Sequence, residues 1–186
     1  MKKYLFTSLM LTVVFVIICG AFYPLLIAGI AKFAPGGGKG ETLSVNGKVV
    51  GYANVGQKFT ADKYFWGRPS AVGYNANGSG GSNKGPSDSA YLKQVEAAID
   101  TFLVHNPTVK KEEIPAEMVT ASGSGLDPDI TPQGAYIQVA RIAKTRNMNE
   151  DRILKLIAVH IEKSILGPKE KVNVLKLNIA LDTLNK

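Results

Sequence analysis

The feature that most constrains this chain is an uncharged apolar run near its beginning. No Asp, Glu, Lys or Arg occurs from Tyr4 to Ala31, and lysines flank the run on both sides. A helix needs about 20 apolar residues to cross the hydrocarbon core of a bilayer, and this run is longer. Pro24 is compatible with such a helix, because membrane helices tolerate proline. The run therefore predicts a transmembrane helix from Leu5 to Ile30.

A cleaved signal peptide is the alternative interpretation of this run. The apolar part of a signal peptide is typically only about 7–15 residues long, which is far shorter than the run here. The small residues of Gly29-Ile30-Ala31 leave a cleavage site open, whereas Cys19 follows two isoleucines, unlike the cysteine of a lipoprotein signal. The lysines on the two sides nearly balance, so the positive-inside rule does not give the orientation.

The charges and cysteines of the chain argue against several classes of function. The net charge is +7, but the positive residues are spread out, and Lys110-Lys111 is followed at once by two glutamates. Without a basic stripe interleaved with aromatic residues, nucleic-acid binding is not indicated. Cys19 is the only cysteine and lies in the apolar run, so the domain has neither a disulfide nor a cysteine-based zinc site. His105 and His160 are far apart, and no metal-ligand spacing is present.

A glycine-rich stretch from Tyr64 to Leu92 dominates the rest of the chain. Its glycines tolerate positive φ and its prolines lack a backbone donor, so neither a helix nor a central strand fits it. A loop of this length inside a domain is usually functional or disordered. Disorder would leave Tyr64, Phe65, Trp66 and Tyr74 in water, which favours an ordered surface loop. A second glycine-rich run covers Ala121 to Pro128, where Asp127 and Asp129 are expected to shape a turn.

The segments around these loops predict a single small, helix-rich α+β domain after the transmembrane helix. Residues 1–32 hold the N-terminus and the span, residues 33–41 a glycine-rich tether, and residues 42–186 the domain. Asn46-Gly47 between apolar runs predicts a β-hairpin over residues 43–50. A helix capped by Ser87 is expected to end at Asn106-Pro107. Further helices are expected from Pro132 to Asn147 after a Thr131 cap, from the Asn149 cap through Ile161, and from Asn173 to Leu184 beyond a break at Gly167-Pro168.

Three blocks of the sequence resemble a known family. They are Tyr64-Phe65-Trp66-Gly67-Arg68-Pro69-Ser70-Ala71 with Tyr74-Asn75 and Ser79-Gly80-Gly81-Ser82-Asn83, then Val119 to Pro128, then Val172 to Asp182. In this order they are similar to the C chain of the bacterial high-affinity potassium-transporting ATPase, the Kdp system. The resemblance covers nearly the whole chain. Where the family more usually has a proline before the arginine at Arg141, this chain has Ala140.

The resemblance implies an accessory subunit of an ATP-driven potassium importer in the inner membrane. It also implies a cytoplasmic N-terminus and an extracytoplasmic domain. The implied partners are a channel-like potassium-translocating subunit, a P-type ATPase catalytic subunit and a small single-span subunit, besides membrane lipid. The family's proposed role is a catalytic chaperone that raises the ATP affinity of the catalytic subunit in a ternary complex. An extracytoplasmic domain cannot touch cytoplasmic ATP, so this effect would need coupling through the span and the partners.

No motif in the sequence indicates catalysis or tight cofactor binding by this chain alone. Ser79-Gly80-Gly81-Ser82 shares a Ser-Gly-Gly core with the ABC-transporter signature, but the chain lacks a Walker A sequence. A nucleophile elbow has the pattern Gly-x-Ser-x-Gly, and the residues around Ser79 lack the first glycine, whereas those around Ser124 lack both. We therefore expect a non-catalytic chain, and favour a loop shaped for a protein surface over a phosphate site. A membrane-anchored binding module of the cell envelope, unrelated to transport, is the alternative.

The candidate contact residues lie in the two glycine-rich runs. For contact with a partner or a nucleotide they are Arg68, Ser79, Gly80, Gly81, Ser82 and Asn83 in the first run, and Ser122, Gly123, Ser124 and Asp127 in the second. Arg68 suits bracing of its own loop through its five donors, and contact with a partner is the alternative.

Overall fold

A computed structural model describes residues 2–163 and 170–184 of the chain. The chain forms two compact units, Met1–Thr42 and Leu43–Lys186. The predicted break at Gly167-Pro168 lies outside the described residues.

The first unit is a long apolar helix. It consists of α1 (Lys2–Ile17), a π-helical turn η1 (Ile18–Phe22) and α2 (Tyr23–Ala31), and a 3₁₀ turn η2 (Pro35–Gly38) follows. In the π turn the N–H of Tyr23 donates to the carbonyl of Ile18. This widening lies just before Pro24, whose ring would clash with a carbonyl of a regular α-helix. Tyr4–Ala31 comprises 28 residues, and an 18-residue window within it has a mean hydropathy of 2.6. The segment is long and apolar enough to cross a bilayer.

The predicted β-hairpin follows the first unit along the chain. It consists of β1 (Thr42–Val45) and β2 (Lys48–Tyr52), which pair with each other. Asn46 and Gly47 have φ values of 50° and 78°. A two-residue hairpin turn requires positive φ at both central positions, and asparagine and glycine adopt it at low cost.

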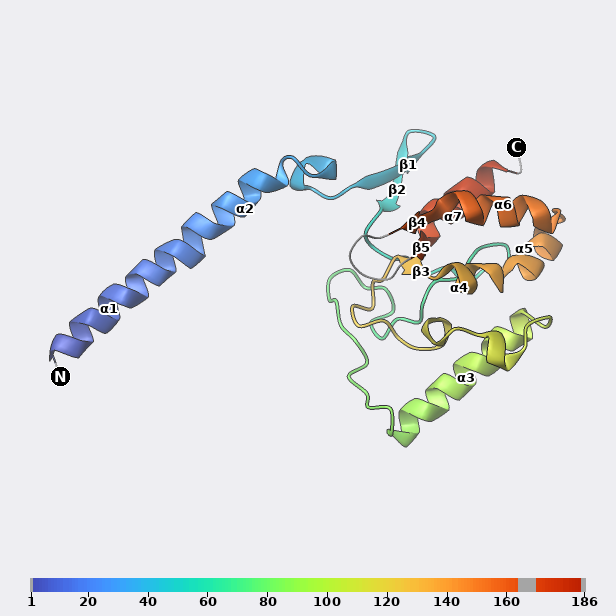
Figure 1. Ribbon diagram of the computed structural model, residues 1–186, viewed down its shortest axis with the longest axis horizontal. Coiled ribbons are helices and arrows are strands. Elements are labelled where there is room, and N and C mark those ends of the chain that lie inside the picture. Colours follow the sequence, from blue (N-terminus) through green and yellow to red (C-terminus); the bar gives the residue numbers. More distant parts are fainter. Residues whose placement is uncertain (1, 164–169, 185–186) are drawn as a thin grey trace. The chain divides into compact units, whose positions relative to one another are not determined.

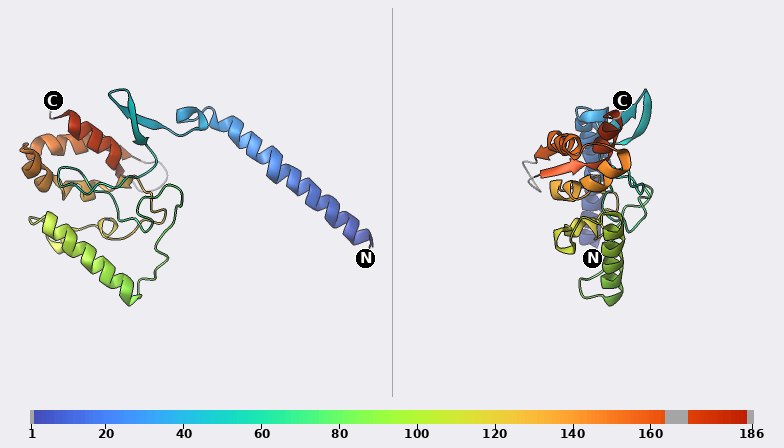
Figure 2. Two further views of the ribbon diagram at one scale, coloured as in Figure 1. Left: turned by 180° about the vertical axis from the view of Figure 1, so that it is seen from behind. Right: turned by 90° about the vertical axis from the view of Figure 1, so that its right-hand side faces the viewer.

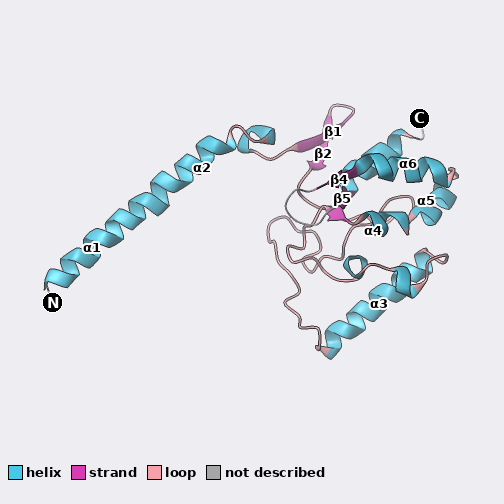
Figure 3. Ribbon diagram, in the orientation of Figure 1, coloured by secondary structure: helices cyan, strands magenta, loops and turns pink. Residues whose placement is uncertain are grey.

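Helices and a small antiparallel sheet form the core of the second unit (Figures 1 and 3). The elements are α4 (Pro132–Tyr136), α5 (Val139–Arg146), α6 (Glu150–His160) and α7 (Val174–Thr183), with a sheet ordered β3 (Asp129–Ile130), β5 (Glu170–Asn173), β4 (Ile161–Lys163). In the central strand, Val172 pairs with Ile130 on one side and Ile161 on the other. Val172 is fully buried among the aliphatic side chains of α5, α6 and α7. The predicted α+β fold is confirmed.

Residues 58–69, called the central segment below, lead into the long loop and cross this core without forming a strand. Phe65 has no exposed surface. Its N–H donates to Oδ1 of Asn178 at 2.9 Å, and Nδ2 of Asn178 donates to its carbonyl at 3.0 Å. Gln138 brackets Trp66 in the same way, at 2.8 and 3.2 Å. Two side-chain amides thus satisfy the backbone groups that a neighbouring strand would satisfy in a sheet.

The helix α3 (Ser89–His105) lies on the other side of the loops from the group of α4 to α7 (Figures 1 and 2). Two 3₁₀ turns follow it, η3 (Lys111–Glu113) and η4 (Ala116–Met118). Phe102 is buried, whereas Leu92 is 52% exposed. At the C-terminal end of α3, His105 Nδ1 lies 2.7 Å from Asp62 Oδ1. The strongest attachments of α3 are therefore near its C-terminus.

Helix caps are largely as predicted, but three helix limits are wrong. The side chains of Thr131, Asn149 and Asn173 each accept a backbone N–H at the start of a helix, as predicted. Asp88, and not Ser87, caps α3, because its carboxylate accepts the N–H of Tyr91. The helix predicted from Pro132 to Asn147 is interrupted at Ile137-Gln138, where Gln138 binds Trp66. Ile161 leaves the helix predicted to include it, because it pairs with Val172.

Candidate functional site

The two glycine-rich runs lie side by side. The N–H of Gly80 and the hydroxyl of Ser79 both donate to the carbonyl of Ser124, at 2.8 and 3.0 Å. A Cβ on Gly81 would lie 3.1 Å from the carbonyl oxygen of Gly123, so the backbones nearly touch. Residues 79–83 and 122–127 together are called the two-loop surface below.

Gly125 marks the closest approach of the two runs. Its φ is +67°, and a Cβ there would lie 2.5 Å from Cγ2 of Val72 and 2.7 Å from the carbonyl oxygen of Gly80. Only glycine combines this backbone conformation with so close a contact. Gly123, two residues earlier, has open space where its Cβ would be. The packing of the two runs therefore requires glycine at position 125 but leaves room for a side chain at position 123.

Two serines brace the inner side of the two-loop surface. Ser122 is buried; its N–H donates to the carbonyl of Pro69 at 3.2 Å, and its hydroxyl accepts the N–H of Gly125 at 2.9 Å. Ser70 donates its hydroxyl to the carbonyl of Gly125 at 2.6 Å and accepts the N–H of Tyr74 at 2.9 Å. Ser122, a predicted contact residue, thus holds the loop from inside.

Arg68 and Asp127 join the two runs by an ion pair. Nη1 of Arg68 lies 2.9 Å from Oδ2 of Asp127, and both side chains are partly buried. Oδ1 of Asp127 accepts the N–H of Asp129 at 3.1 Å, which is the turn predicted for these two aspartates. Arg68 therefore braces the loop, as favoured from the sequence. Its Nε is buried and has no hydrogen-bond partner among the described residues.

Tyr74 connects the long loop to this ion pair. Its φ is +62°, and its hydroxyl donates to the carbonyl of Arg68 at 2.5 Å. Burial raises the pKa of Tyr74 to about 12, with a further contribution from the Asp127 carboxylate and an opposing one from Arg68. The neutral phenol is the form that the folded chain favours.

We expect Tyr74→Phe to reduce the loss of stability at alkaline pH. An unfolded tyrosine ionises near pH 10, whereas folded Tyr74 keeps its proton until about pH 12. Between these values the unfolded state binds fewer protons, so the unfolding free energy of the wild type falls as pH rises. The variant lacks this loss, so its deficit from the missing hydrogen bond should shrink. Urea unfolding between about pH 8 and about pH 12 measures the difference, and a deficit that stays constant contradicts the expectation.

Arg141 organises the opposite side of the central segment. Its side chain is 2% exposed, and its guanidinium carbon lies 4.6 Å from the ring centroid of Trp66. Burial lowers the pKa of Arg141 to about 10, opposed by the Asp62 carboxylate, so the side chain stays charged at neutral pH. Its donors reach the carbonyls of Asp62 (2.6 Å) and Tyr64 (3.0 Å), Oδ1 of Asn106 (3.0 Å) and Oε1 of Gln138 (2.6 Å).

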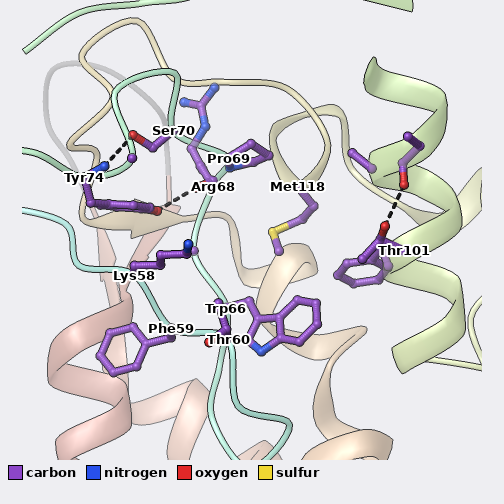
Figure 4. Close-up of a pocket in the computed structure, with 15 residues that line it drawn as sticks. Lys58, Phe59, Thr60, Trp66, Arg68, Pro69, Ser70, Tyr74, Thr101 and Met118 are labelled. Atoms are coloured by element: carbon purple, nitrogen blue, oxygen red, sulfur yellow. Dashed lines mark hydrogen bonds between the residues drawn. The ribbon is translucent and has the colours of Figure 1, made fainter. Parts of the chain in front are cut away.

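A cleft of about 420 Å³ lies between the central segment and α3 (Figure 4). Lys58 and Tyr74 lie on one side of it and Thr101 of α3 on the other, with Trp66 below in that view. Its lining is mainly apolar, and the larger apolar and aromatic side chains in it are Phe59, Trp66, Pro69, Tyr74, Phe102 and Met118. Aromatic residues of the first block of the resemblance thus reach a surface hollow.

The candidate residues differ in what they present to solvent. Ser79, Asn83, Gly123 and Ser124 are exposed, whereas the other candidates are partly covered or, like Ser122, buried. Within the described residues, no group of three or more His, Cys, Asp or Glu could hold a metal ion. The two-loop surface therefore offers hydroxyls and backbone groups on a braced frame. This arrangement suits contact with another protein better than it suits bond-making chemistry.

Sequence reasoning missed the amides that hold the central segment. Gln138, Asn178 and Asn106 are all buried, and each binds backbone or Arg141. Two of them lie on the inner faces of predicted helices, where a buried amide among apolar residues would have been a usable signal, because such groups are kept only when hydrogen-bonded.

Known proteins match this chain over nearly its whole length. The family model described as the c chain of the K+-transporting ATPase matches residues 5–183. A potassium-transporting ATPase KdpC subunit of Flavobacterium johnsoniae is 60% identical over 98% of this chain and 99% of its own length. The KdpC subunit of Bacteroides fragilis strain NCTC 9343 is 54% identical over 98% of both chains, and that of Caldanaerobacter subterraneus subsp. tengcongensis is 47% identical over 91% and 90%. The matches include the apolar helix and both glycine-rich runs, and the chain therefore belongs to the KdpC family, the c chain of the K+-transporting ATPase.

Proposed function

We propose that this chain is a non-catalytic accessory subunit that is needed for assembly or stability of an ATP-driven potassium importer. Its similarity to subunits of potassium-transporting ATPases supports this role. The observation that carries the proposal is the two-loop surface, in which an ion pair and the hydroxyls of Ser70 and Ser122 fix exposed polar groups in place. A rigid, exposed loop surface of this kind suits recognition of a partner.

The proposed partners are the channel-like potassium-translocating subunit, the P-type ATPase catalytic subunit and the small single-span subunit. The apolar helix Tyr4–Ala31 supports insertion into the inner membrane. In the proposed topology the N-terminus is cytoplasmic, and residues 42–186 are extracytoplasmic. ATP hydrolysis then belongs to the catalytic subunit.

Copurification from potassium-starved cells tests the proposed role. A tagged full-length chain is expected to bring down the other ATPase subunits, and Gly80→Leu is expected to lower their yield while the chain stays folded. A Cβ at Gly80 meets only Cγ1 of Val72, at an ordinary contact distance of 3.5 Å, so the fold should accept the change. Gly85→Leu is the matched control, because a Cβ at Gly85 meets nothing within 4 Å. If the wild type brings down no ATPase subunit, the envelope binding module becomes the better interpretation.

The proposed chaperone effect on ATP affinity is indirect in this topology. Extracytoplasmic residues are separated by the membrane from cytoplasmic ATP, so a change in nucleotide affinity must pass through contacts of the span with partner subunits. Such coupling is a free-energy difference between two states of the complex. Substitutions along one face of the span should then reproduce the loss of ATP affinity that follows removal of the chain.

The full-length chain by itself is expected to bind ATP-Mg²⁺ weakly, with a Kd on the order of 1 mM or higher. A Kd of about 1 mM corresponds to a binding free energy of about −4 kcal/mol. Arg68, beside the two-loop surface, is already paired with Asp127, and the chain lacks a Walker A sequence that would cradle phosphates. Calorimetry on the purified chain in detergent measures this affinity. Micromolar binding that disappears when Ser79 and Ser82 are changed to alanine would overturn the prediction and support direct contact with nucleotide in a ternary complex.

A further inference from the structure

We propose that the cleft between the central segment and α3 receives an apolar side chain and an adjacent Asp or Glu from a loop of a partner subunit. This inference rests on the proposed function, and it names a site of contact separate from the two-loop surface.

The size and lining of the cleft suit an apolar anchor. Its volume is about 420 Å³, and its lining is dominated by aromatic and aliphatic atoms. Trp66 and Phe102 are held from behind, the first by Gln138 and Arg141 and the second by the core. The cleft is thus preformed. In protein interfaces, a few apolar or aromatic anchors that fill such pockets supply most of the binding energy.

The α3 wall of the cleft is shaped to admit a side chain. Ala97, Ala98 and Thr101 line it from the helix, and their small side chains leave the space open. Ala97 and Thr101 are exposed, so the mouth of the cleft lies at the surface. The hydroxyl of Thr101 donates to the carbonyl of Ala97 at 2.8 Å (Figure 4), which turns this side chain back onto its own helix and leaves the wall apolar.

The positive charge that lines the cleft favours an Asp or Glu next to the apolar side chain of the partner. Lys58 lines it, is exposed and forms no ion pair among the described residues. Arg68 also lines it, but its Nη1 is paired with Asp127 and its Nε is buried, so Lys58 is the charged group that remains accessible. No Asp or Glu is among the described lining residues. An approaching carboxylate would therefore meet the unpaired ammonium group of Lys58, and such a charge pair fixes orientation and register in a complex.

The same inventory argues against a nucleotide in this cleft. A magnesium-bound triphosphate needs several phosphate contacts and oxygen ligands for the metal. The cleft has a single unpaired ammonium, and the Nη1 of Arg68 is already committed to Asp127. One carboxylate, by contrast, matches one ammonium group.

Charge reversal in the assembled ATPase tests the proposal. Lys58→Glu is expected to lower the yield of copurified ATPase subunits by about tenfold or more, because it places like charges together in a desolvating contact. Lys93→Glu is the matched control, since Lys93 is an exposed lysine of α3 that does not line the cleft. Both variants should keep the wild-type unfolding midpoint, followed by fluorescence of the single tryptophan.

Photo-crosslinking identifies what fills the cleft. A benzophenone amino acid at Thr101 in the assembled complex should give a crosslink to a partner-subunit peptide in which an apolar residue adjoins Asp or Glu. The same probe at Val104, 77% exposed on α3 and outside the cleft lining, is the control. A crosslink to lipid, to this chain itself or to a partner peptide without an acidic residue would overturn the proposal.

The outcomes separate this inference from the proposed function. If the wild type and Lys93→Glu assemble and Lys58→Glu does not, both stand. If all three assemble equally well, the cleft is not a docking site although the chain remains a subunit. If the wild type itself assembles with no ATPase subunit, the proposed function fails and the inference fails with it.

Discussion

Replacing Arg141 with methionine should lower the unfolding free energy of the chain by about 3–5 kcal/mol. Methionine fills most of the same space, but it leaves the carbonyls of Asp62 and Tyr64 and the amide oxygen of Asn106 without a donor. The amide oxygen of Gln138 loses one of its two donors and keeps the N–H of Trp66. Each buried acceptor that loses its partner costs about 1–3 kcal/mol. The sum exceeds any gain from removing a buried charge, so destabilisation should win.

Arg141→Lys should restore only part of this stability. Lysine keeps the charge, but its ammonium is a compact donor that does not reproduce the planar fork of a guanidinium. It also loses the stacking on Trp66, whose ring centroid lies 4.6 Å from the guanidinium carbon. A structural role for charge alone would predict full rescue, so the lysine variant distinguishes the two explanations.

Urea unfolding of the full-length chain in detergent measures both variants. The signals are the fluorescence of the single tryptophan and circular dichroism, because Trp66 itself contacts the changed residue. Arg152→Met is the control, since exposed Arg152 makes a hydrogen bond to the carbonyl of Leu184. A loss below about 1 kcal/mol for Arg141→Met would mean that water replaces the guanidinium at those acceptors.

Features that depend on neighbouring residues were predictable from the sequence. The uncharged run gives the long apolar helix, and Asn46-Gly47 gives the hairpin because two positive φ values exclude most other residues. Asn149 and Asn173 cap helices as predicted, since a capping amide acts on N–H groups two or three residues away. These are local effects, and distant parts of the chain did not override them.

Features that depend on distant residues were not predictable in the same way. The strands β3, β4 and β5 are each two to four residues long, too short to show a period in the sequence. Ile161 fits the apolar spacing of the preceding helix, yet it pairs with Val172. Gln138 interrupts a helix because Trp66, 72 residues earlier, offers it a backbone partner. In each case a tertiary contact decided the local structure.

The interruption of the helix at Gln138 also explains why either proline or alanine fits at position 140. The helix α5 starts at Val139, so Ala140 is its second residue. A proline is tolerated in the first turn of a helix, because the N–H groups there have no partner within the helix. The proline that the family more usually has before this arginine would therefore fit, and its replacement by Ala140 leaves the contacts of Arg141 intact.

The sequence predicted the two loops of the candidate site separately. It did not predict that they lie against each other. Arg68 and Asp127 were each named, but nothing in the sequence paired residues 59 positions apart. Glycine content located the runs, yet it did not distinguish Gly123, which has room for a side chain, from Gly125, which has none. That distinction requires the contact with Val72 and Gly80, which only the folded chain provides.

Gly125→Ala is accordingly expected to lower the unfolding free energy by about 2–5 kcal/mol, combining a cost of about 1–2 kcal/mol for a left-handed backbone with a steric cost of about 1–3 kcal/mol. The new Cβ would lie 2.5 Å from Cγ2 of Val72 and 2.7 Å from the carbonyl oxygen of Gly80, so the two runs must separate. Gly123→Ala is the matched control and should change stability by less than about 1 kcal/mol, because its Cβ enters open space. Urea unfolding measures both, and the yield of copurified ATPase subunits should fall for Gly125→Ala alone. Equal effects of the two substitutions on stability would show that the runs move apart at little cost, and the two-loop surface would then not be the rigid unit from which its proposed role is argued.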